Sequence, residues 1–426
     1  MSQQELELPQ GWAETTVEHC VNILDGKRIP INSKERAKRI GKIPYYGARG
    51  QTGWINDFIF NEELVLIGED GAPFLDFAKD TAYVISGKSW VNNHAHVVRA
   101  IDELTSNQFL CHYLNIFDYH EIITGTTRMK LNQSSLKKIQ VPLPPLNEQK
   151  RIVSKIEELF SRIDSAKQSL EYAKLQLEQY RQSLLKSAFE GKHTEKWESV
   201  KLESITEKIL NTNPKDNPDH KFKYCDIASI DNTNHIIVNP KNFLGKDAPS
   251  RARQIIHQED VIFSTVRTYL HNFAIVPSEL NNQLCSTGFC VLRGDDSIIT
   301  KLIFYLVQTI QFESYLNPLQ RGTSYPAVRN NDILNYTFLL PPLDEQEQIV
   351  SQIEQGFSLI ENTTQNIESS LQNLQTMKMS VLKQAFEGKL VPQDPNDEPA
   401  SVLLERIKST KASESTKQRR IKNVKK

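Results

Sequence analysis

The sequence predicts an α+β protein with a pseudo-two-fold internal repeat. Two globular mixed α/β domains are expected to be separated by two long antiparallel coiled-coil helices. Three observations lead to this fold class: one segment occurs twice, both copies carry apolar residues every seven positions, and short β-like runs fill the two regions between them.

The repeated segment is long and needs no gap to align. Residues 141–192 match residues 338–389 at a fixed offset of 197, and 25 of the 52 positions are identical. Both copies open with "LPPLxEQ" and close with "AFEGK", whereas the regions upstream differ apart from a similar start at Trp12 and Trp197. The predicted segments are a first domain at 1–145, a first helix at 146–192, a second domain at 193–342, a second helix at 343–389 and a C-terminal segment at 390–426.

The repeated segments are predicted to be helices that start after Pro-Pro pairs and end at Gly191 and Gly388. Each is expected to span about 37 residues, or about 55 Å. The alternative, a lone surface helix on a globular domain, is disfavoured because five heptads occur twice. Small residues at the d positions of the second helix would let the first helix approach closely. The predicted pairing residues are the a rows: Ile156, Ile163, Leu170, Leu177 and Leu184, and Ile353, Ile360, Ile367, Leu374 and Val381. The d rows are Ile152, Leu159, Ala166, Ala173 and Tyr180, and Ile349, Gly356, Thr363, Ser370 and Met377.

The two regions between the helices show a mixed α+β pattern. "ELVLIG", "AYVIS" and "HVVRA" predict strands in the first, and "DVIFSTV" and "GFCVLRG" predict strands in the second. "NQFLCHYLNIF" and "KLIFYLVQTIQFESYL" predict helical stretches. Differing domains beside matching helices suggest that each domain binds something different while the helices fix the distance between them.

The composition limits the compartment and the partners. The formal net charge is −1, so any surface that attracts nucleic acid must be local. The polar N-terminus predicts no signal peptide, and no apolar run predicts a membrane span. Five cysteines without a CxxC pattern favour a reducing, cytoplasmic compartment and predict neither a disulfide framework nor a metal site.

A basic segment in the first domain is the main candidate for binding DNA. Residues 26–50 hold eight Lys or Arg against one acid, with tyrosines and glycines between them, which suits phosphate and base contacts by a pliable loop. A solvated charged loop is the alternative. The candidates here are Lys27, Arg28, Lys34, Arg36, Lys38, Arg39, Tyr45, Tyr46, Arg49 and Gln51.

Other polar segments extend the predicted contacts into both domains. "WVNNHAHVV" suggests groove contacts on one face of a strand, with a purely structural role as the alternative. "GTTRMK" and "GTSYPAVR" lie at equivalent positions before the two helices, so both domains are expected to use the same loop. The candidates are Asn92, Asn93, His94, His96, Thr126, Thr127 and Arg128 in the first domain, and Arg251, Arg253, Thr265, Arg267, Tyr269, His271, Asn272, Thr323, Ser324, Tyr325 and Arg329 in the second.

No catalytic site is predicted. The Pro-Pro pairs lack the Asn/Asp-Pro-Pro-aromatic loop of adenine methyltransferases, and "GKS" at 87–89 lacks the preceding glycine of a phosphate-binding loop. The two "EGK" fragments lie at helix ends without a nearby Pro-Asp. No arrangement of nucleophile and base stands out.

Together these features resemble the specificity subunit of Type I restriction–modification systems over nearly the whole chain. "IPYYGARGQTGWI", "GEDGAP" and "GKSWVNNHAHV" are similar to one type of target-recognition domain, and "DVIFSTVRTYLHNFAIV" with "STGFCVLRG" is similar to another. The resemblance implies a non-catalytic subunit that binds double-stranded DNA at two half-sites with a fixed gap.

The resemblance also implies the partners. Two methylation subunits would dock on the helices and carry the S-adenosylmethionine chemistry at adenine N6, and two restriction subunits would use ATP and Mg²⁺, so no cofactor is expected on this chain. The basic tail at 401–426 is expected to touch DNA or a partner, or to be a disordered end. Two alternatives remain: a coiled-coil adaptor whose domains bind proteins, and a self-sufficient nuclease or methyltransferase, which the absent motifs disfavour.

Overall fold

The computed structural model describes residues 8–190 and 196–410, and the chain divides into two compact units. Unit 1 comprises residues 1–170 and 369–426, and unit 2 comprises residues 171–368. Each unit contains one mixed α/β domain together with part of each long helix. The last sixteen residues of the basic tail and the predicted cap Gly191 lie outside the described residues.

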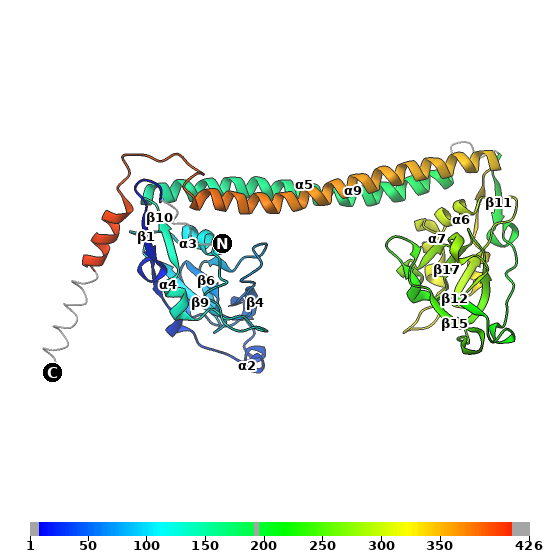
Figure 1. Ribbon diagram of the computed structural model, residues 1–426, viewed down its shortest axis with the longest axis horizontal. Helices are drawn as coiled ribbons and strands as arrows, with labels where there is room; N and C mark the ends of the chain where they lie inside the picture. Colours follow the sequence, from blue (N-terminus) through cyan, green and yellow to red (C-terminus); the bar gives the residue numbers. More distant parts are fainter. Residues whose placement is uncertain (1–7, 191–195, 411–426) are drawn as a thin grey trace. The chain divides into compact units, whose positions relative to one another are not determined.

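The domain of unit 1 contains two four-stranded sheets and a two-stranded ribbon (Figure 1). One sheet has the order β2 (Val21–Ile23), β9 (Ala95–Ala100), β6 (Leu64–Gly68), β7 (Ala82–Ile85), and the other has the order β4 (Gly50–Ile55), β3 (Ile43–Gly47), β8 (Lys88–Val91), β5 (Phe60–Asn61). The ribbon pairs β1 (Ala13–Thr16) with β10 (Gln140–Leu143). The helices are α1 (Val17–Cys20), α2 (Ser33–Lys38), α3 (Asn107–Ile116) and α4 (Gln133–Lys138).

The domain of unit 2 repeats most of this topology with different side chains, except that its counterpart of the β2-β9-β6-β7 sheet has three strands. Its sheets have the orders β18 (Phe273–Ile275), β17 (Val261–Ser264), β20 (Phe289–Leu292) and β15 (Lys241–Leu244), β12 (Lys221–Cys225), β19 (Gln283–Ser286), β16 (Ala252–Ile256). Both domains place one parallel pair in the middle of the four-stranded sheet, β3 with β8 and β12 with β19. The remaining strands are β11 (Glu198–Lys201), β21 (Thr337–Leu340), β13 (Ile230–Asp231) and β14 (Ile236–Ile237), and the helices are α6 (Thr300–Leu306), α7 (Ile310–Leu316) and α8 (Asn330–Leu334).

The long helices are α5 (Leu146–Glu190) and α9 (Leu343–Phe386), which begin directly after the two Pro-Pro pairs. They contain 45 and 44 residues, so the expected length of about 37 was too short; at 1.5 Å per residue each measures about 67 Å. Proline lacks an N–H and clashes with a preceding helical turn, which fixes both starts. Gly388 follows the end of α9 with φ +69°, and a Cβ there would lie 2.4 Å from Pro9 Cγ.

Within each unit α5 and α9 pair antiparallel. In unit 1, Lys378 Nζ lies 2.6 Å from Asp164, and in unit 2, Lys174 Nζ lies 2.7 Å from Glu368, so residue numbers rise along one helix as they fall along the other. A Cβ on Gly356 would come within 2.3 Å of Leu184 Cδ2, which is the close approach that a small d-row residue permits.

The heptad rows are occupied unevenly. All ten predicted a-row residues are buried or half-buried. In the d rows, Tyr180 and Met377 are exposed, and the contacts pass instead to Leu185, Leu382 and Ala385. The heptad prediction is wrong at these two positions, where the neighbouring Arg181 and Lys378 instead lie over the rings of Phe357 and Phe160 of the partner helix.

Equivalent hydrogen bonds fix both domains on the helices. Trp12 Nε1 donates to Glu148 at 3.1 Å, and Trp197 Nε1 donates to Glu345 at 2.8 Å. The buried amides of Gln149 and Gln346 each donate to two backbone carbonyls. These contacts give the repeated Glu-Gln of "LPPLxEQ" a physical role.

The phenylalanine of each "AFEGK" segment packs against the domain that precedes the other long helix. Phe386 of α9 packs against Phe109 and Tyr113 in unit 1, and Phe189 of α5 packs against the core of unit 2. Each domain therefore holds the start of the helix that follows it and the end of the other. Residues 400–410 form a further helix on the core of unit 1, where Ala400 and Leu404 are buried.

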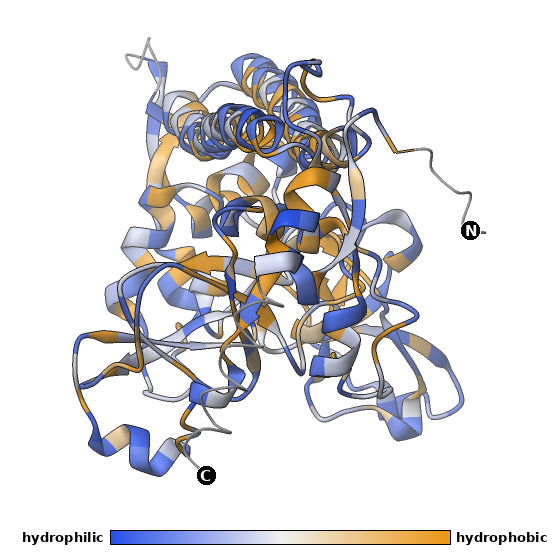
Figure 2. Ribbon diagram, turned by 90° about the vertical axis from the view of Figure 1, so that its left-hand side faces the viewer, coloured by the Kyte–Doolittle hydropathy of each residue, from blue (hydrophilic) through white to orange (hydrophobic). Residues whose placement is uncertain are grey.

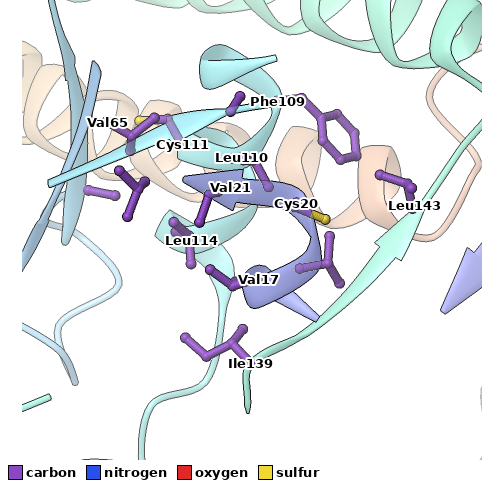
Figure 3. Close-up of a cluster of buried hydrophobic side chains, with 14 of the residues drawn as sticks. Val17, Cys20, Val21, Val65, Phe109, Leu110, Cys111, Leu114, Ile139 and Leu143 are labelled. Carbon is purple, nitrogen blue, oxygen red and sulfur yellow. The ribbon is translucent and has the colours of Figure 1, made fainter. Parts of the chain in front are cut away.

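The cores lie between the sheets and the helices. In unit 1, Val65 of β6 and Leu110 of α3 belong to one buried cluster with Val17 and Leu143 (Figure 3). Apolar residues gather on the inner strands and helices, whereas the outer faces are polar (Figure 2). Among the described residues, no helix combines the length and the apolar character that crossing a membrane requires.

Several local predictions are corrected here. Part of the basic segment forms α2, which Asn32 caps by accepting a hydrogen bond from Glu35 N at 2.9 Å, so it is not one pliable loop. "WVNNHAHVV" is interrupted by a turn at 92–94, so His94 and His96 do not share a strand face. The helical stretch after residue 300 breaks into α6 and α7, because Thr309 caps a new helix by accepting from Phe312 N.

Candidate nucleic-acid interface

A hairpin loop occurs at the same place in both domains. The first hairpin loop (residues 124–130) is closed by a bridge between Thr124 and Lys130, and the second hairpin loop (residues 321–327) by a bridge between Arg321 and Ala327. A glycine follows the first residue of each, with φ +88° at Gly125 and +98° at its equivalent. The expectation of an equivalent loop in each domain is therefore confirmed in its geometry.

In unit 1, the first hairpin loop joins the segment after β6 through a charged network. Asp70 Oδ1 lies 2.9 Å from Arg128 Nη2 and 2.7 Å from His94 Nδ1. Arg49 Nε donates to Gly71 O at 2.7 Å. Three of the predicted contact residues, Arg49, His94 and Arg128, thus converge on one short segment. Thr126 and Thr127 are exposed beside them.

The turn after β8 is held against the neighbouring strand. Asn92 N donates to Tyr46 O at 3.1 Å, and Asn92 Oδ1 accepts from His94 N at 2.8 Å. Asn93 is exposed, and Gln51 is exposed with its amide bonded to Gly53 O at 3.2 Å. These amides present donors and acceptors that suit base edges.

The basic segment divides into free and anchored cations. Lys27, Lys34, Lys38 and Lys42 are exposed, and none has an acidic partner in the part of the chain that the structure describes. α2, which carries two of them, lies at the end of the domain away from α5 and α9 (Figure 1). Exposed lysines without an acidic partner among the described residues suit phosphate contacts.

Two arginines instead pack α2 onto the sheet. Arg36 lies over the ring of Tyr45 at 4.8 Å, and Arg39 lies over the ring of Trp90 at 4.5 Å while contacting Asp57 at 3.4 Å. Both side chains are half-buried. The prediction that they contact DNA remains a prediction, and the structure gives each a packing role as well.

The structure corrects four predicted contacts. His96 is 1 % exposed and Tyr45 is 2 % exposed, and burial raises the pKa of Tyr45. Thr265 is buried and donates to Gly288 O at 3.0 Å. Arg28 lies 2.8 Å from Glu69 and 3.6 Å from Asp25. A side chain whose polar atoms are committed inside the domain cannot also reach DNA from this conformation.

In unit 2, the second hairpin loop is joined to its neighbour by an aromatic contact. The guanidinium of Arg267 lies over the ring of Tyr325 at 4.5 Å, and Nη2 donates to Ser324 O at 3.0 Å. Arg267 and His271 both have left-handed backbone, φ +49° and +54°, and they flank a short turn that exposes Tyr269. Left-handed conformations are costly for non-glycine residues and often mark functional sites.

The other candidate DNA-contacting residues of unit 2 lie outside this Arg–Tyr contact. Arg253 Nη1 donates to Asn213 Oδ1 at 2.9 Å, while Arg251 and Thr323 are exposed. Asn272 is half-buried and its carbonyl accepts from Ser264 N. Arg329 precedes α8 with an exposed side chain.

Sequence reasoning missed the acids of the interface. Asp70 and Glu69 organise the cations of unit 1, and Asp332 holds Arg321 at 2.6 Å, which lowers the pKa of Asp332. Carboxylates repel DNA phosphates, so a search for direct contacts passes over them. "GEDGAP" contained the signal, because two adjacent acids beside a glycine turn are available to orient nearby arginines.

Comparison with known proteins agrees with this architecture. The family model for the Type I restriction modification DNA specificity domain matches residues 9–175 and again residues 194–372. The chain is similar to the Type I restriction enzyme EcoDI specificity subunit of Escherichia coli, with 25% identity over 96% of this chain and 97% of that protein. It is also similar to the EcoKI specificity subunit of Escherichia coli K12, with 24% identity over 74% of each chain.

The fold has a solved counterpart. A chain from a structure of the type I R-M system, in work on its complex assembly and conformational transition, superposes with a TM-score of 0.67 at 18% identity, covering 90% of this chain and 100% of that one. The predicted fold class is confirmed by this match and by the two family matches, which together cover most of the sequence. The chain therefore belongs to the family of Type I restriction–modification DNA specificity proteins and carries two copies of the specificity domain.

Proposed function

We propose that this chain is the non-catalytic, DNA-reading subunit of a Type I restriction–modification enzyme. Each domain reads one half of a bipartite double-stranded target, and a fixed gap separates the halves. The observation that carries the proposal is the pair of hairpin loops. Both loops have the same backbone frame, but a charged network holds the first and an Arg–Tyr stack holds the second. Different chemistry on one frame is what two different half-sites require.

The partners follow from the family and from the internal symmetry. Methylation subunits bind the α5 and α9 surfaces, and two copies are expected because the repeated helices offer two equivalent sites. They supply S-adenosylmethionine and the transfer of a methyl group to adenine N6. Two restriction subunits, which use ATP and Mg²⁺, join this core. The complex works on DNA in the cytoplasm.

The DNA-binding residues are proposed in two roles. The exposed lysines of the α2 region contact phosphates and give affinity that depends on salt. The two hairpin loops and the side-chain amides of Gln51, Asn92 and Asn93 contact base edges and give sequence preference. The anchored arginines and the acids hold these groups in position.

Methylome sequencing of a host that expresses this chain with its methylation subunit tests the proposal. The expected result is a single bipartite motif whose methylation disappears when this chain is deleted. A motif that persists without the chain, or a chain that binds partner proteins while the complex shows no sequence preference on DNA, would support the adaptor alternative instead.

A further inference from the structure

A buried charged cluster in unit 1 lies directly beneath the first hairpin loop. His96 of β9 places Nδ1 2.7 Å from Asp25 Oδ2 and Nε2 2.9 Å from Leu131 O. The imidazole is almost fully buried, and Asp25 is buried with it. The cluster is buried, so its groups do not contact DNA directly from this conformation.

Both partners of the imidazole are hydrogen-bond acceptors. The Leu131 carbonyl can only accept. Asp25 also accepts from Val97 N at 2.8 Å and from Gln133 Nε2 at 2.9 Å. Burial by itself would raise the pKa of Asp25, but the hydrogen bonds from His96 and Gln133 hold it below its ordinary value, so the carboxyl is ionised. A ring that faces two acceptors must donate from both nitrogens, and only the imidazolium form does so.

The surrounding charges agree with a protonated ring. Glu69 Oε2 lies 3.9 Å from His96 Nδ1, and Arg28 bridges Glu69 and Asp25. Lys130 reaches Glu69 from the exposed side at 3.3 Å. If the ring were neutral, the enclosed carboxylates of Asp25 and Glu69 would have only the Arg28 guanidinium as an enclosed positive charge. The imidazolium supplies the second positive charge.

The cluster holds the base of the hairpin loop from two sides. Leu131 N donates to Glu69 O at 2.8 Å, and Leu131 O accepts from His96. A neutral ring keeps one N–H, which stays on Nδ1 because the ionised carboxylate is the stronger acceptor. The lone pair on Nε2 would then face the Leu131 carbonyl, so deprotonation releases the loop and leaves Asp25 bound.

We propose that His96 is a positioning residue that, as an imidazolium, latches the first hairpin loop through Leu131, so that the first domain reads its half-site well only while the ring is protonated. The link to DNA reading rests on the proposed function; the latch itself does not.

The ring and the loop can be measured in the full-length chain without DNA. Histidine labelled with ¹⁵N should show one buried ring protonated on both nitrogens at about pH 6, and its resonance should be absent in the H96Q variant. Hydrogen exchange of residues 124–131 should show about tenfold lower protection in the H96Q variant than in the unaltered chain. A buried ring that is singly protonated at about pH 6, or equal protection in the two chains, overturns the latch.

The DNA test uses the complex with its methylation subunits and a duplex carrying the motif found by methylome sequencing. The H96Q complex should bind this duplex about tenfold more weakly than the unaltered complex, and the difference should vanish when the first half-site is scrambled.

Equal affinities of the H96Q complex and the unaltered complex for this duplex overturn the role in reading. If no bipartite motif exists, the proposed function fails, while the ring and exchange measurements still decide the latch on their own.

Discussion

The two glutamines of the repeated "LPPLxEQ" motif should differ in their contribution to stability, and the structure gives the direction. Gln346 is fully buried and makes three hydrogen bonds: Nε2 donates to Ser297 O at 2.9 Å and to Pro341 O at 2.8 Å, and Oε1 accepts from Ile299 N at 2.8 Å. Gln149 makes two, to Leu104 O at 3.0 Å and Pro144 O at 2.9 Å.

The difference lies in the side-chain oxygen. Gln149 Oε1 is buried and has no hydrogen-bond partner among the described residues. Replacing Gln346 by Leu leaves three backbone groups without this partner, one in a buried and two in partly buried hydrogen bonds, and should cost about 3–5 kcal/mol. Replacing Gln149 by Leu leaves two backbone groups without a partner but also removes an unsatisfied acceptor, so about 1–3 kcal/mol is expected. The substitution in unit 2 should therefore be the more damaging by about 2 kcal/mol.

Hydrogen exchange with denaturant measures the opening free energy of each unit separately, which suits a chain of two units. The matched control is Gln348→Leu on the exposed face of α9, which should change stability by less than about 0.5 kcal/mol. Equal losses for the two buried sites, or a larger loss for Gln149→Leu, would refute the hydrogen-bond accounting.

Three further substitutions test the interface and the cores. Replacing Lys34 and Lys38 by Ala should weaken DNA binding and lower the slope of log K against log salt by about two units, because each phosphate contact contributes about 0.9. An unchanged slope would show that α2 is a solvated surface that does not contact DNA. Tyr325→Ala should weaken binding about tenfold by removing the stack with Arg267, whereas Tyr325→Phe should not, and scrambling the second half-site should abolish the difference. Burial lowers the pKa of His112 to about 4, so this ring adds stability at pH values above its unfolded pKa of about 6.5, and that stability is lost as the pH falls toward 4. The chain should therefore lose stability between about pH 7 and pH 5 in urea unfolding, and His112→Phe should make this loss smaller by about 2 kcal/mol. An identical pH dependence in the variant would contradict this.

The parts that sequence predicts well are those governed by local rules. The Pro-Pro pairs fix the starts of both long helices, and the apolar runs locate β6, β9, β17 and β20. The close approach at Gly356 follows from a small residue in a d row. Trp12 and Trp197 mark equivalent starts because each tryptophan binds the glutamate of the same motif.

Other features depend on tertiary contacts that no local pattern contains. His96 reads as a polar residue available for binding until the fold surrounds it with Asp25 and Leu131. The shared sheet order of the two domains is invisible because topology depends on which strands pair, and differing side chains can satisfy the same pairing. Tyr180 and Met377 are exposed because the neighbouring Arg181 and Lys378 make the contacts with the partner helix instead.

The central claim is that the two domains read separate halves of one target. Replacing residues 13–140 by the corresponding domain of another family member, while keeping α5, α9 and unit 2, tests it most directly. Methylome sequencing of the host that expresses the hybrid with its methylation subunit should return a bipartite motif in which one half is new and the other half is unchanged. A motif that changes in both halves, or one that does not change at all, would contradict the account.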